Sequence, residues 1–420
     1  MLVDFKVTNF RSFKTEQEFS METGEYLRKY PENTLRENNK RLLKSAMIFG
    51  ANANGKTNLI KSLQMLKYLV TMPTNDIEDK LASDTFGNNE ENTKFEITFI
   101  SNKEEYYYLL EYNKEEVVTE CLKKNNKTIF NRSEQSFEVP KQIRNLKENV
   151  RKNQLLLYFA QKNNERVSIE AYHWFAQDLI IINFNRNIIP IKNIKKLKNK
   201  DFKDRVLNLL KAADFDITDI EVQEAVDDVP MEILKILLHP DDEEKNNFGK
   251  NVKRKTYKVY TTHRCDNGYF TIDFSQESTG TQAFLCFAFY LLEGNNKVLL
   301  ADEFDCSYHT ELAQALLKII NSQNQQNQFI LTTHNPDLLD CKLRQDQIWF
   351  VDKNAFNKKT KSHYGESELF SLFEFDDAKL TRHDVSYKKR YLQGLYGGTQ
   401  IVNQSLLEAG IEDEQKKEQE

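Results

Sequence analysis

The sequence Gly50-Ala-Asn-Ala-Asn-Gly-Lys56-Thr57 decides the fold. It has the spacing G-x-x-x-x-G-K-[ST], in which glycines let successive backbone N–H groups turn inward around a polyphosphate. Lys56 is expected to reach the β- and γ-phosphates, and the Thr57 hydroxyl to occupy one position on Mg²⁺. The predicted nucleotide-binding set is Gly50, Asn52, Asn54, Gly55, Lys56, Thr57 and Asn58.

The residues on either side of this loop support the prediction. Residues 45–49, Ser-Ala-Met-Ile-Phe, have the composition of a buried parallel strand that leads into the loop. Residues 58–70 carry apolar side chains at helical spacing, so a helix N-terminus would direct its dipole at the phosphates. The alternative is a chance glycine-rich turn, which would not require a strand before it and a helix after it.

A second segment supplies acidic groups. Val298-Leu-Leu-Ala-Asp-Glu303 has four apolar residues followed by two adjacent carboxylates, which is typical of a buried strand with acids at its C-terminal end. Asp302 would belong to the Mg²⁺ shell, and Glu303 would act as the general base toward the attacking water. The adjacent acids favour an ATPase over a GTPase. The alternative is an edge strand that ends in solvated acids.

Two further positions could contact phosphate. Ser278 and Gly280 precede the strongly apolar stretch 283–292, so they would lie at the N-terminus of a buried helix, a second anion site. His334 follows the apolar residues 328–331 and could hydrogen-bond a γ-phosphate. Taken singly, Ser278 could be an ordinary helix cap and His334 a structural histidine.

The order of these elements resembles the ABC-type ATPase heads of the SMC/RecF group, and residues 7–13, Val-Thr-Asn-Phe-Arg-Ser-Phe, resemble the strand and turn that open such heads. More narrowly, the chain resembles the RloA-like and AbiL-type ATPases of bacterial anti-phage systems. The segments that carry this second resemblance are 212–220, 277–282, 302–309, 332–339, 344–350 and 390–398.

The resemblance implies an α/β P-loop ABC-type head split into two lobes, with Ser278 and Gly280 in the signature motif and His334 as the switch histidine. It implies MgATP as the ligand, and a homodimer or higher oligomer in which the signature of one copy meets the nucleotide of the other. It also implies a separate nuclease effector, RloB-like or of TOPRIM type, and a DNA or phage trigger. Glu303, Lys56 and His334 would be the catalytic residues.

Composition limits the other classes of function. The 420 residues carry a net charge of −5, which disfavours a surface built throughout for nucleic acid. Five cysteines without a C-x-x-C pair favour a reducing cytoplasm over a zinc or disulfide framework. No signal peptide or membrane-length apolar run is present, so we expect a cytoplasmic protein without a membrane partner.

The long interval between Lys56 and Ser278 shows no sustained heptads, so we expect a mainly helical insertion instead of a long coiled coil. Antiparallel strands are predicted at 95–100, 106–112 and 117–122, and a mobile polar loop at 241–255. The expected divisions are a first lobe (1–135), the insertion (136–250), a second lobe (251–407) and a disordered acidic tail (408–420).

The basic stretch 191–203, with Lys192, Lys195, Lys196 and Lys198, could bind a phosphate backbone or be a solvated face.

Three hypotheses for function remain open at this point. The first is a defence ATPase that senses infection and controls a toxic effector, as in abortive infection. The second is a RecF-like DNA-repair ATPase, and the third an ATP-dependent scaffold with negligible turnover, because Thr279 replaces a signature glycine.

Overall fold

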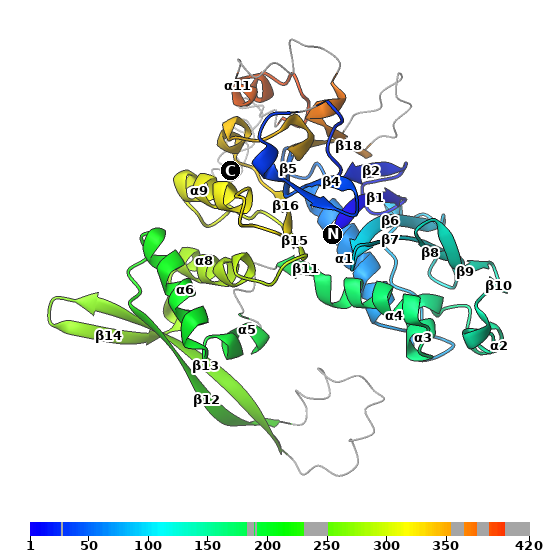
Figure 1. Cartoon of the computed structure of the whole chain (residues 1–420), viewed down its shortest axis with the longest axis horizontal. Coiled ribbons are helices and arrows are strands. Elements are labelled where there is room, and N and C mark those ends of the chain that lie inside the picture. The colour runs from blue at the N-terminus through cyan, green and yellow to red at the C-terminus, as the bar shows by residue number, and fades with distance from the viewer. Residues whose placement is uncertain are drawn as a thin grey trace, which may run out of the picture. The chain divides into compact units, whose positions relative to one another are not determined.

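The computed structural model describes residues 1–26, 28–182, 189, 191–230, 251–353, 365–375 and 386–399 (Figure 1). The expected disordered tail, 408–420, lies outside these residues. Two compact units are distinguished: residues 1–182 together with 294–420, and residues 183–293. The first unit contains two large sheets and the candidate loop, and the second contains a three-stranded sheet with helices.

A six-stranded sheet lies at the centre of the first unit, in the order β11-β15-β16-β5-β17-β18. The first five strands are parallel, and β18 pairs antiparallel with β17. Their bounds are β11 Leu179–Ile182, β15 Val298–Ala301, β16 Gln328–Thr332, β5 Ser45–Phe49, β17 Ile348–Lys353 and β18 Ser367–Ser371. Every residue of β5, β15 and β16 is buried, as expected for central parallel strands.

Two helices follow strands of this sheet in the sequence. Helix α1 (Lys56–Thr71) follows β5 and buries Leu59, Leu63, Leu66 and Val70, which recur at helical spacing. Helix α9 (Thr310–Ile320) follows β15 and buries Leu316, Leu317 and Ile320. The α/β fold class expected from the sequence is therefore confirmed, with the glycine-rich loop between β5 and α1.

A seven-stranded antiparallel sheet forms the rest of the first unit, in the order β10-β9-β8-β7-β6-β1-β2. Its strands are β1 Leu2–Thr8, β2 Gln17–Ser20, β6 Thr93–Ser101, β7 Glu104–Tyr112, β8 Val117–Lys124, β9 Lys127–Ser133 and β10 Ser136–Glu138. This confirms the three antiparallel strands predicted in this region. Alternate residues of β7 are buried, so one face of the sheet contributes to the core.

Short helices cover part of the antiparallel sheet: η3 (Lys141–Ile143), α2 (Leu146–Asn149), α3 (Leu156–Lys162), α4 (Arg166–His173) and the π-helix η4 (Trp174–Asp178). Trp174 is fully buried, and its ring stacks on Phe99 of β6 at 4.1 Å between centroids. The buried Glu120 carboxylate accepts hydrogen bonds from the backbone N–H groups of Leu156 and Leu157, at 2.6 and 2.8 Å. It thereby caps the start of α3.

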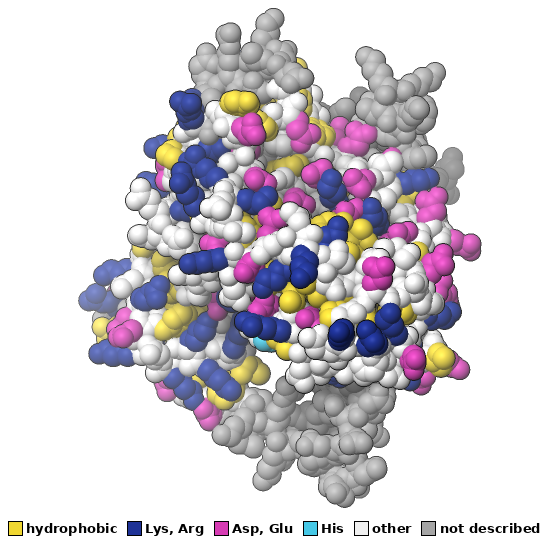
Figure 2. All heavy atoms as spheres, turned by 45° about the vertical axis from the view of Figure 1, so that its right-hand side comes forward, with side chains coloured by type: hydrophobic (Ala, Val, Ile, Leu, Met, Phe, Trp, Pro, Cys, Tyr) yellow, Lys and Arg dark blue, Asp and Glu magenta, His cyan; other side chains and the backbone are white. Residues whose placement is uncertain are grey.

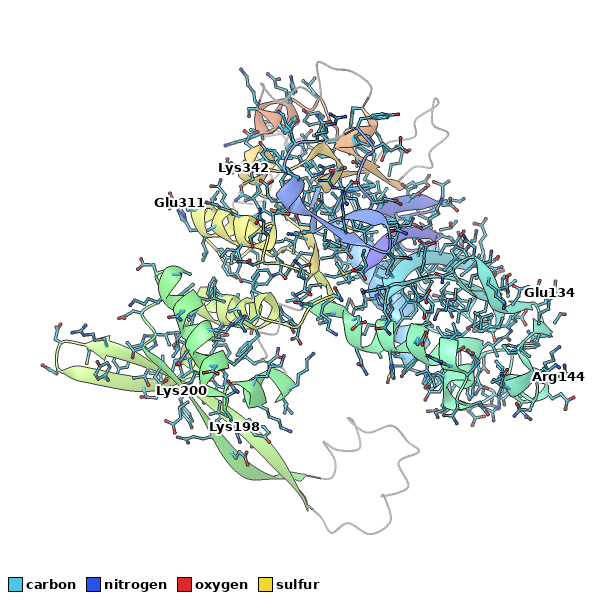
Figure 3. All side chains as sticks on the ribbon, in the orientation of Figure 1. Glu134, Arg144, Lys198, Lys200, Glu311 and Lys342 are labelled. Carbon is cyan, nitrogen blue, oxygen red and sulfur yellow. The ribbon has the colours of Figure 1, made fainter. Side chains whose placement is uncertain are left out.

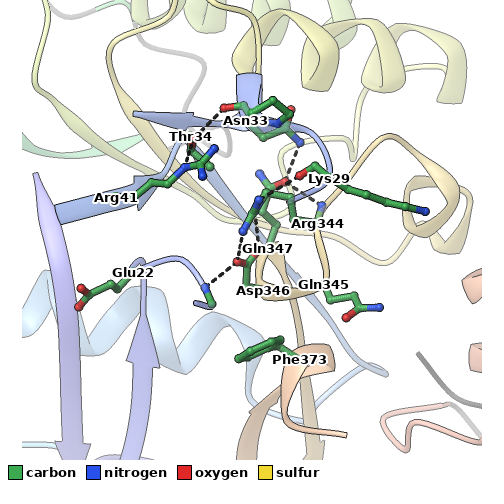
Figure 4. Close-up of polar contacts among 12 residues, drawn as sticks. Glu22, Lys29, Asn33, Thr34, Arg41, Arg344, Gln345, Asp346, Gln347 and Phe373 are labelled. Carbon is green, nitrogen blue, oxygen red and sulfur yellow. Dashed lines mark hydrogen bonds and ion pairs between the residues drawn. The ribbon is translucent and has the colours of Figure 1, made fainter. Parts of the chain in front are cut away.

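A buried ion pair fixes the turn before β17 (Figure 4). Arg344 donates to both carboxylate oxygens of Asp346, at 3.0 and 2.7 Å, and to the backbone carbonyl of Lys29, at 2.9 Å. In the same turn Gln347 donates to the backbone carbonyl of Ser45, at 3.0 Å, at the first residue of β5. The 344–350 segment therefore helps to place the strand that leads into the glycine-rich loop.

The second unit combines helices and a sheet. Its elements are α5 Ile191–Lys196, α6 Lys200–Ala212, β12 Asp219–Pro230, β13 Asn251–Cys265, β14 Gly268–Asp273, η7 Phe274–Gln276 and α8 Thr279–Leu291. Helices α6 and α8 are neighbours, and their Phe202 and Phe289 rings stack at 5.9 Å. Residues 241–250 of the predicted loop lie outside the described residues. The prediction is wrong for residues 251–255, which pair with β12 as the start of β13.

The basic stretch 191–203 is partly neutralised by acidic partners. Lys196 pairs with Glu293 at 3.0 Å, Lys203 pairs with Asp219 at 2.7 Å, and Lys198 pairs with Glu224. Figure 3 labels Lys198 and Lys200 in this unit, which flank the start of α6. These pairings favour the solvated-face interpretation over a phosphate-binding surface.

The remaining elements are short connections: η1 Pro31–Asn33, β3 Thr34–Glu37, β4 Lys40–Leu43, η2 Phe86–Asn88, η8 Pro336–Asp340, η9 Gln345–Gln347, η10 Leu372–Glu374 and α11 Tyr387–Leu392. On the face drawn in Figure 2, basic and acidic side chains are interspersed. Among the described residues, none of the helices combines the length and the hydrophobicity that crossing a bilayer would require.

Candidate nucleotide site

Four neighbouring parallel strands bring the predicted residues to one edge of the central sheet. Strand β5 leads into Gly50, β15 into Asp302 and Glu303, and β16 toward His334. Strand β17 ends beside them at Asp352 and Lys353. The C-terminal edge of an open parallel sheet is where such folds bind ligands. The structure thus brings Gly50 and His334, which are 284 positions apart in the sequence, to the same edge of the sheet.

The glycine-rich loop is packed too tightly for larger residues at the two glycines of its motif, Gly50 and Gly55. A Cβ on Gly50 would lie 2.6 Å from the backbone oxygen of Val351. Gly55 has φ +110°, and a Cβ there would lie 2.6 Å from Ser367 Oγ and 2.7 Å from Ser12 Oγ. Gly55 is the N-cap of the 16-residue helix α1, and no side chain caps that helix. Its first N–H groups are therefore available to an anion.

Lys56 is buried and points back into the loop. Its ammonium donates to the backbone carbonyls of Gly50 and Ala51, at 2.7 and 3.0 Å, and lies 3.2 Å from His334 Nδ1. Burial lowers the pKa of Lys56 to about 8, although Glu303, Asp302 and Asp305 act in the opposite direction. A cation held next to the loop in this way is suited to a polyphosphate ligand.

The Thr57 hydroxyl and the Asp302 carboxylate meet, as the magnesium prediction requires. Thr57 Oγ1 donates to Asp302 Oδ1 at 3.1 Å, and Thr332 Oγ1 donates to the same oxygen at 2.6 Å. Two hard oxygen donors fit an Mg²⁺ ion that takes its other ligands from phosphates and water. In the described residues no cluster of three or more acidic, histidine or cysteine side chains is arranged to hold a metal ion.

Glu303 and His334 form a polar pair at the mouth of the site. His334 Nε2 lies 3.3 Å from Glu303 Oε1, and both side chains are partly exposed, at 38% and 49%. The other ring nitrogen, Nδ1, lies 3.2 Å from the Lys56 ammonium. The result is a chain from the lysine through the histidine to the carboxylate.

The backbone at Glu303 is strained. Its φ is +50°, a left-handed conformation that few residues other than glycine adopt. The backbone N–H of Glu303 donates to Thr332 Oγ1 at 2.7 Å, and the next N–H, of Phe304, donates to the Thr332 carbonyl at 3.2 Å. These bonds hold the chain in the turn that presents the Glu303 carboxylate.

The three asparagines of the predicted set have different surroundings. Asn54 Nδ2 donates to the carbonyl of Val351 at 3.3 Å and to Asp352 Oδ1 at 3.2 Å. Asn58 Nδ2 donates to Ser12 Oγ at 2.7 Å, within the N-terminal turn expected to precede the loop. Asn52 is exposed at the tip of the loop. Asn54 and Asn58 therefore brace the loop, while Asn52 is open to a ligand.

Ser278 and Gly280 belong to the second unit. Ser278 is the exposed N-cap of α8, and its Oγ accepts a hydrogen bond from the Thr281 N–H at 3.1 Å. Gly280 lies in the first turn of the same helix. The expected helix start is confirmed, and the signature role of both residues stays a prediction.

Several residues of the site were not foreseen. Thr332 joins Asp302 to Glu303, and Thr333 Oγ1 donates to Asp305 at 2.8 Å, where burial raises the pKa of the Asp305 carboxyl. Ser367 Oγ donates to the Asn54 carbonyl at 2.5 Å. The pair Thr332-Thr333, which ends an apolar strand just before His334, is the one signal in the sequence that could have indicated this role.

Taken together, the strand–loop–helix unit and the acids on β15 define a P-loop ATPase domain. The chain belongs to the AAA_21 family, described as "AAA domain, putative AbiEii toxin, Type IV TA system", whose model matches residues 45–340. That match includes the loop, the β15 acids and His334. A search of curated proteins found no match.

Solved structures with a related arrangement come from SMC heads. One is an SMC head bound to the C-terminal winged-helix domain of ScpA (11% identity, TM-score 0.45, 88% of this chain and 97% of that chain). Another is the SMC head domain from Thermotoga maritima (13% identity, TM-score 0.40, 88% of this chain and 98% of that chain). A third is an SMC head domain with an extended coiled coil, bound to the C-terminal domain of ScpA derived from Pyrococcus furiosus (11% identity, TM-score 0.41, 94% of this chain and 99% of that chain).

Proposed function

We propose that this protein binds and hydrolyses MgATP at the loop 50–57, and that ATP joins two copies of the chain. The observation that carries the proposal is the meeting of Lys56, Asp302, Glu303 and His334 at one edge of the central sheet. Lys56 and the α1 N-terminus supply positive charge for the triphosphate. Thr57 and Asp302 would hold Mg²⁺, which would neutralise charge on the β- and γ-phosphates.

In the proposed reaction a water attacks the γ-phosphorus, and the bond to the β-phosphate oxygen breaks as ADP leaves. Glu303 follows Asp302 directly in the sequence and its side chain is 49% exposed, so it can reach a water and take its proton. His334 Nε2 lies 3.3 Å from Glu303 Oε1, and this contact would help to orient the carboxylate. Lys56 remains beside the phosphates and stabilises the charge that develops on them.

The proposed dimer uses two exposed features. Glu303 and His334 open toward solvent, and Ser278 is an exposed cap at the N-terminus of α8, whose dipole favours an anion. In a two-fold dimer, Ser278 and Gly280 of each copy would contact the γ-phosphate bound by the other. ATP hydrolysis would remove these contacts and separate the copies.

The biological role that we propose is control of a separate toxic effector, a nuclease, in anti-phage defence or abortive infection in the cytoplasm. The family description, which names a toxin of a toxin–antitoxin system, supports a role in growth arrest. The ATPase cycle would then be the sensor and the effector the output. The trigger would be DNA or another component of the infecting phage.

The decisive variant is Glu303→Gln, which keeps the shape of the side chain and removes its basicity. We expect ATP binding to persist and phosphate release to fall by about 100-fold or more, the usual contribution of a general base. Light scattering should then show a doubling of the mass with MgATP. Lys56→Ala is the matched control, which should bind no ATP and keep its starting mass.

Two outcomes would contradict the proposal. Wild-type turnover in Glu303→Gln would exclude this residue as the base, and an unchanged mass with MgATP would exclude the ATP-joined dimer. The defence role has its own test. Cells that carry the gene with its neighbours should resist phage, whereas cells with the Lys56→Ala form should not. A tagged copy recovered during infection should bring a nuclease with it.

A further inference from the structure

The segment 386–398, which holds α11 and a glycine-rich turn, lies directly against the phosphate-binding loop. Gly398 has φ +65°, and a Cβ on it would lie 3.4 Å from Gly50 Cα and 3.0 Å from the Val351 carbonyl oxygen. Gly397 has φ +71°, and a Cβ there would lie 2.8 Å from Asp352 Oδ2. Only glycines allow the two backbones to approach this closely. Gly50, the first glycine of the loop, therefore packs against the glycine-rich turn at Gly397 and Gly398.

Asp352 links the turn to the other end of the loop. Its Oδ1 accepts a hydrogen bond from Asn54 Nδ2 at 3.2 Å, and its Oδ2 faces Gly397. The 386–398 segment thus touches the loop at Gly50 directly and at Asn54 through Asp352. These two contacts span the part of the loop that would wrap the phosphates.

An aromatic cluster holds the turn in place. Tyr391 of α11 donates from its hydroxyl to the Gly398 carbonyl at 2.8 Å. Its ring stacks on Phe350 of β17 at 5.7 Å, and the Tyr396 ring stacks on Phe350 at 5.1 Å. Tyr391 also lies 6.5 Å from Phe49, the residue before Gly50. All four rings are buried, so the turn has little freedom to move independently of β5 and β17.

The same segment is tied to the element that follows His334. Ser386 Oγ donates to Asp340 Oδ2 at 2.5 Å, and the backbone N–H of Lys388 donates to Asp340 Oδ1 at 3.2 Å. Lys388 also pairs with Asp337. Both acids lie in η8 (Pro336–Asp340), which begins two residues after His334. One short segment is therefore bonded to both sides of the candidate site.

We propose that the 386–398 segment is a positioning element of the nucleotide site, which holds the loop and the His334 turn in one arrangement. Tyr391, Gly397 and Gly398 act through Gly50 and Asp352, and they do not touch the ligand. This inference rests on the proposed nucleotide binding at residues 50–57. By linkage, if the segment favours the conformation that binds ATP, bound ATP must favour the ordered segment equally.

The test uses the full chain and two variants. Tyr391→Phe removes one buried hydrogen bond and keeps the ring, and we expect ATP affinity to fall about five-fold, the equivalent of about 1 kcal/mol. Gly398→Ala places a methyl 3.0 Å from a backbone oxygen at a positive φ, and we expect a larger loss. Leu392→Ala, at a 61% exposed position of the same helix, is the control and should bind ATP as wild type does.

Hydrogen exchange supplies a readout that a purely structural role would not change. In the wild type, ATP should slow exchange in peptides covering 50–57 and 386–398 together. In Tyr391→Phe, protection of 386–398 by ATP should decrease. ATP protection of 50–57 without any change at 386–398, or normal ATP affinity in both variants, would overturn the inference. Absence of ATP binding to the wild type would instead refute the proposed function, and this inference with it.

Discussion

Thr332→Val is the substitution that tests the geometry of the site most directly. Thr332 is fully buried at the end of β16, and valine has nearly the same shape. The change removes a hydroxyl that donates to Asp302 at 2.6 Å and accepts from the Glu303 N–H at 2.7 Å. The fold should remain, while the carboxylate loses a donor and the strained turn at Glu303 loses its anchor.

The size of the effect follows from these two bonds. A hydrogen bond to a charged carboxylate contributes about 2 kcal/mol, and a buried N–H left without an acceptor costs about 1 kcal/mol or more. We therefore expect the free energy of unfolding to fall by about 3 kcal/mol. About 1–2 kcal/mol of this loss comes from the hydrogen bond to the Glu303 N–H. If it raises the activation free energy by the same amount, because the proposed base is no longer fixed, ATP hydrolysis should slow by roughly 5- to 30-fold.

The assays are denaturant unfolding and steady-state phosphate release with ATP in excess. Ser62→Ala is the matched control, since it also removes a fully buried hydroxyl, one that bonds only the Leu59 carbonyl within α1. It should lose stability without a change in the rate per folded molecule. If Thr332→Val hydrolyses ATP at the wild-type rate while Glu303→Gln does not, the claim that Thr332 positions the base is refuted.

Three further predictions concern the loop, the lysine and the buried ion pair. Gly55→Ala should weaken ATP binding at least ten-fold in an equilibrium titration, because its Cβ would meet two serine oxygens at a positive φ. ATP affinity should be constant below pH 8 and fall up to ten-fold per pH unit above it, since Lys56, with a pKa of about 8, must take up a proton to bind phosphate; a flat profile to pH 10 would contradict this. Arg344→Met should lower the free energy of unfolding by about 3–5 kcal/mol, because Asp346 is left buried without its partner, and adding Asp346→Asn should restore part of that loss.

The sequence located the residues of the candidate site better than the residues that support them. The glycine-rich loop, the two adjacent acids and His334 each follow a short apolar strand in the sequence. That local pattern is sufficient to locate them. The predicted acids, Asp302 and Glu303, directly follow β15, and α1 begins at Lys56, two residues before the predicted helix start at residue 58. Parallel strands end at a common edge of the sheet, so local patterns also predicted that the groups would meet.

The supporting residues could not be predicted in the same way. Ser367 contacts Asn54 across 313 positions, and Gly398 rests on Gly50 across a still longer stretch of chain. Neither contact leaves a periodic or spacing signal near the loop. The start of the long strand β13 was missed because charged residues are poor strand formers alone, and only the pairing with β12 shows that they continue the strand.

The contacts of Lys56 suggest how occupancy of the site reaches the base. Its ammonium is divided among two carbonyl oxygens and His334 Nδ1. A triphosphate offers oxygens with a full negative charge, which bind an ammonium more strongly than neutral acceptors do. If Lys56 turned to a bound phosphate, its 3.2 Å contact with His334 Nδ1 would be lost. Because Nε2 of the same ring lies 3.3 Å from Glu303 Oε1, the orientation of the proposed base would then depend on whether nucleotide is bound.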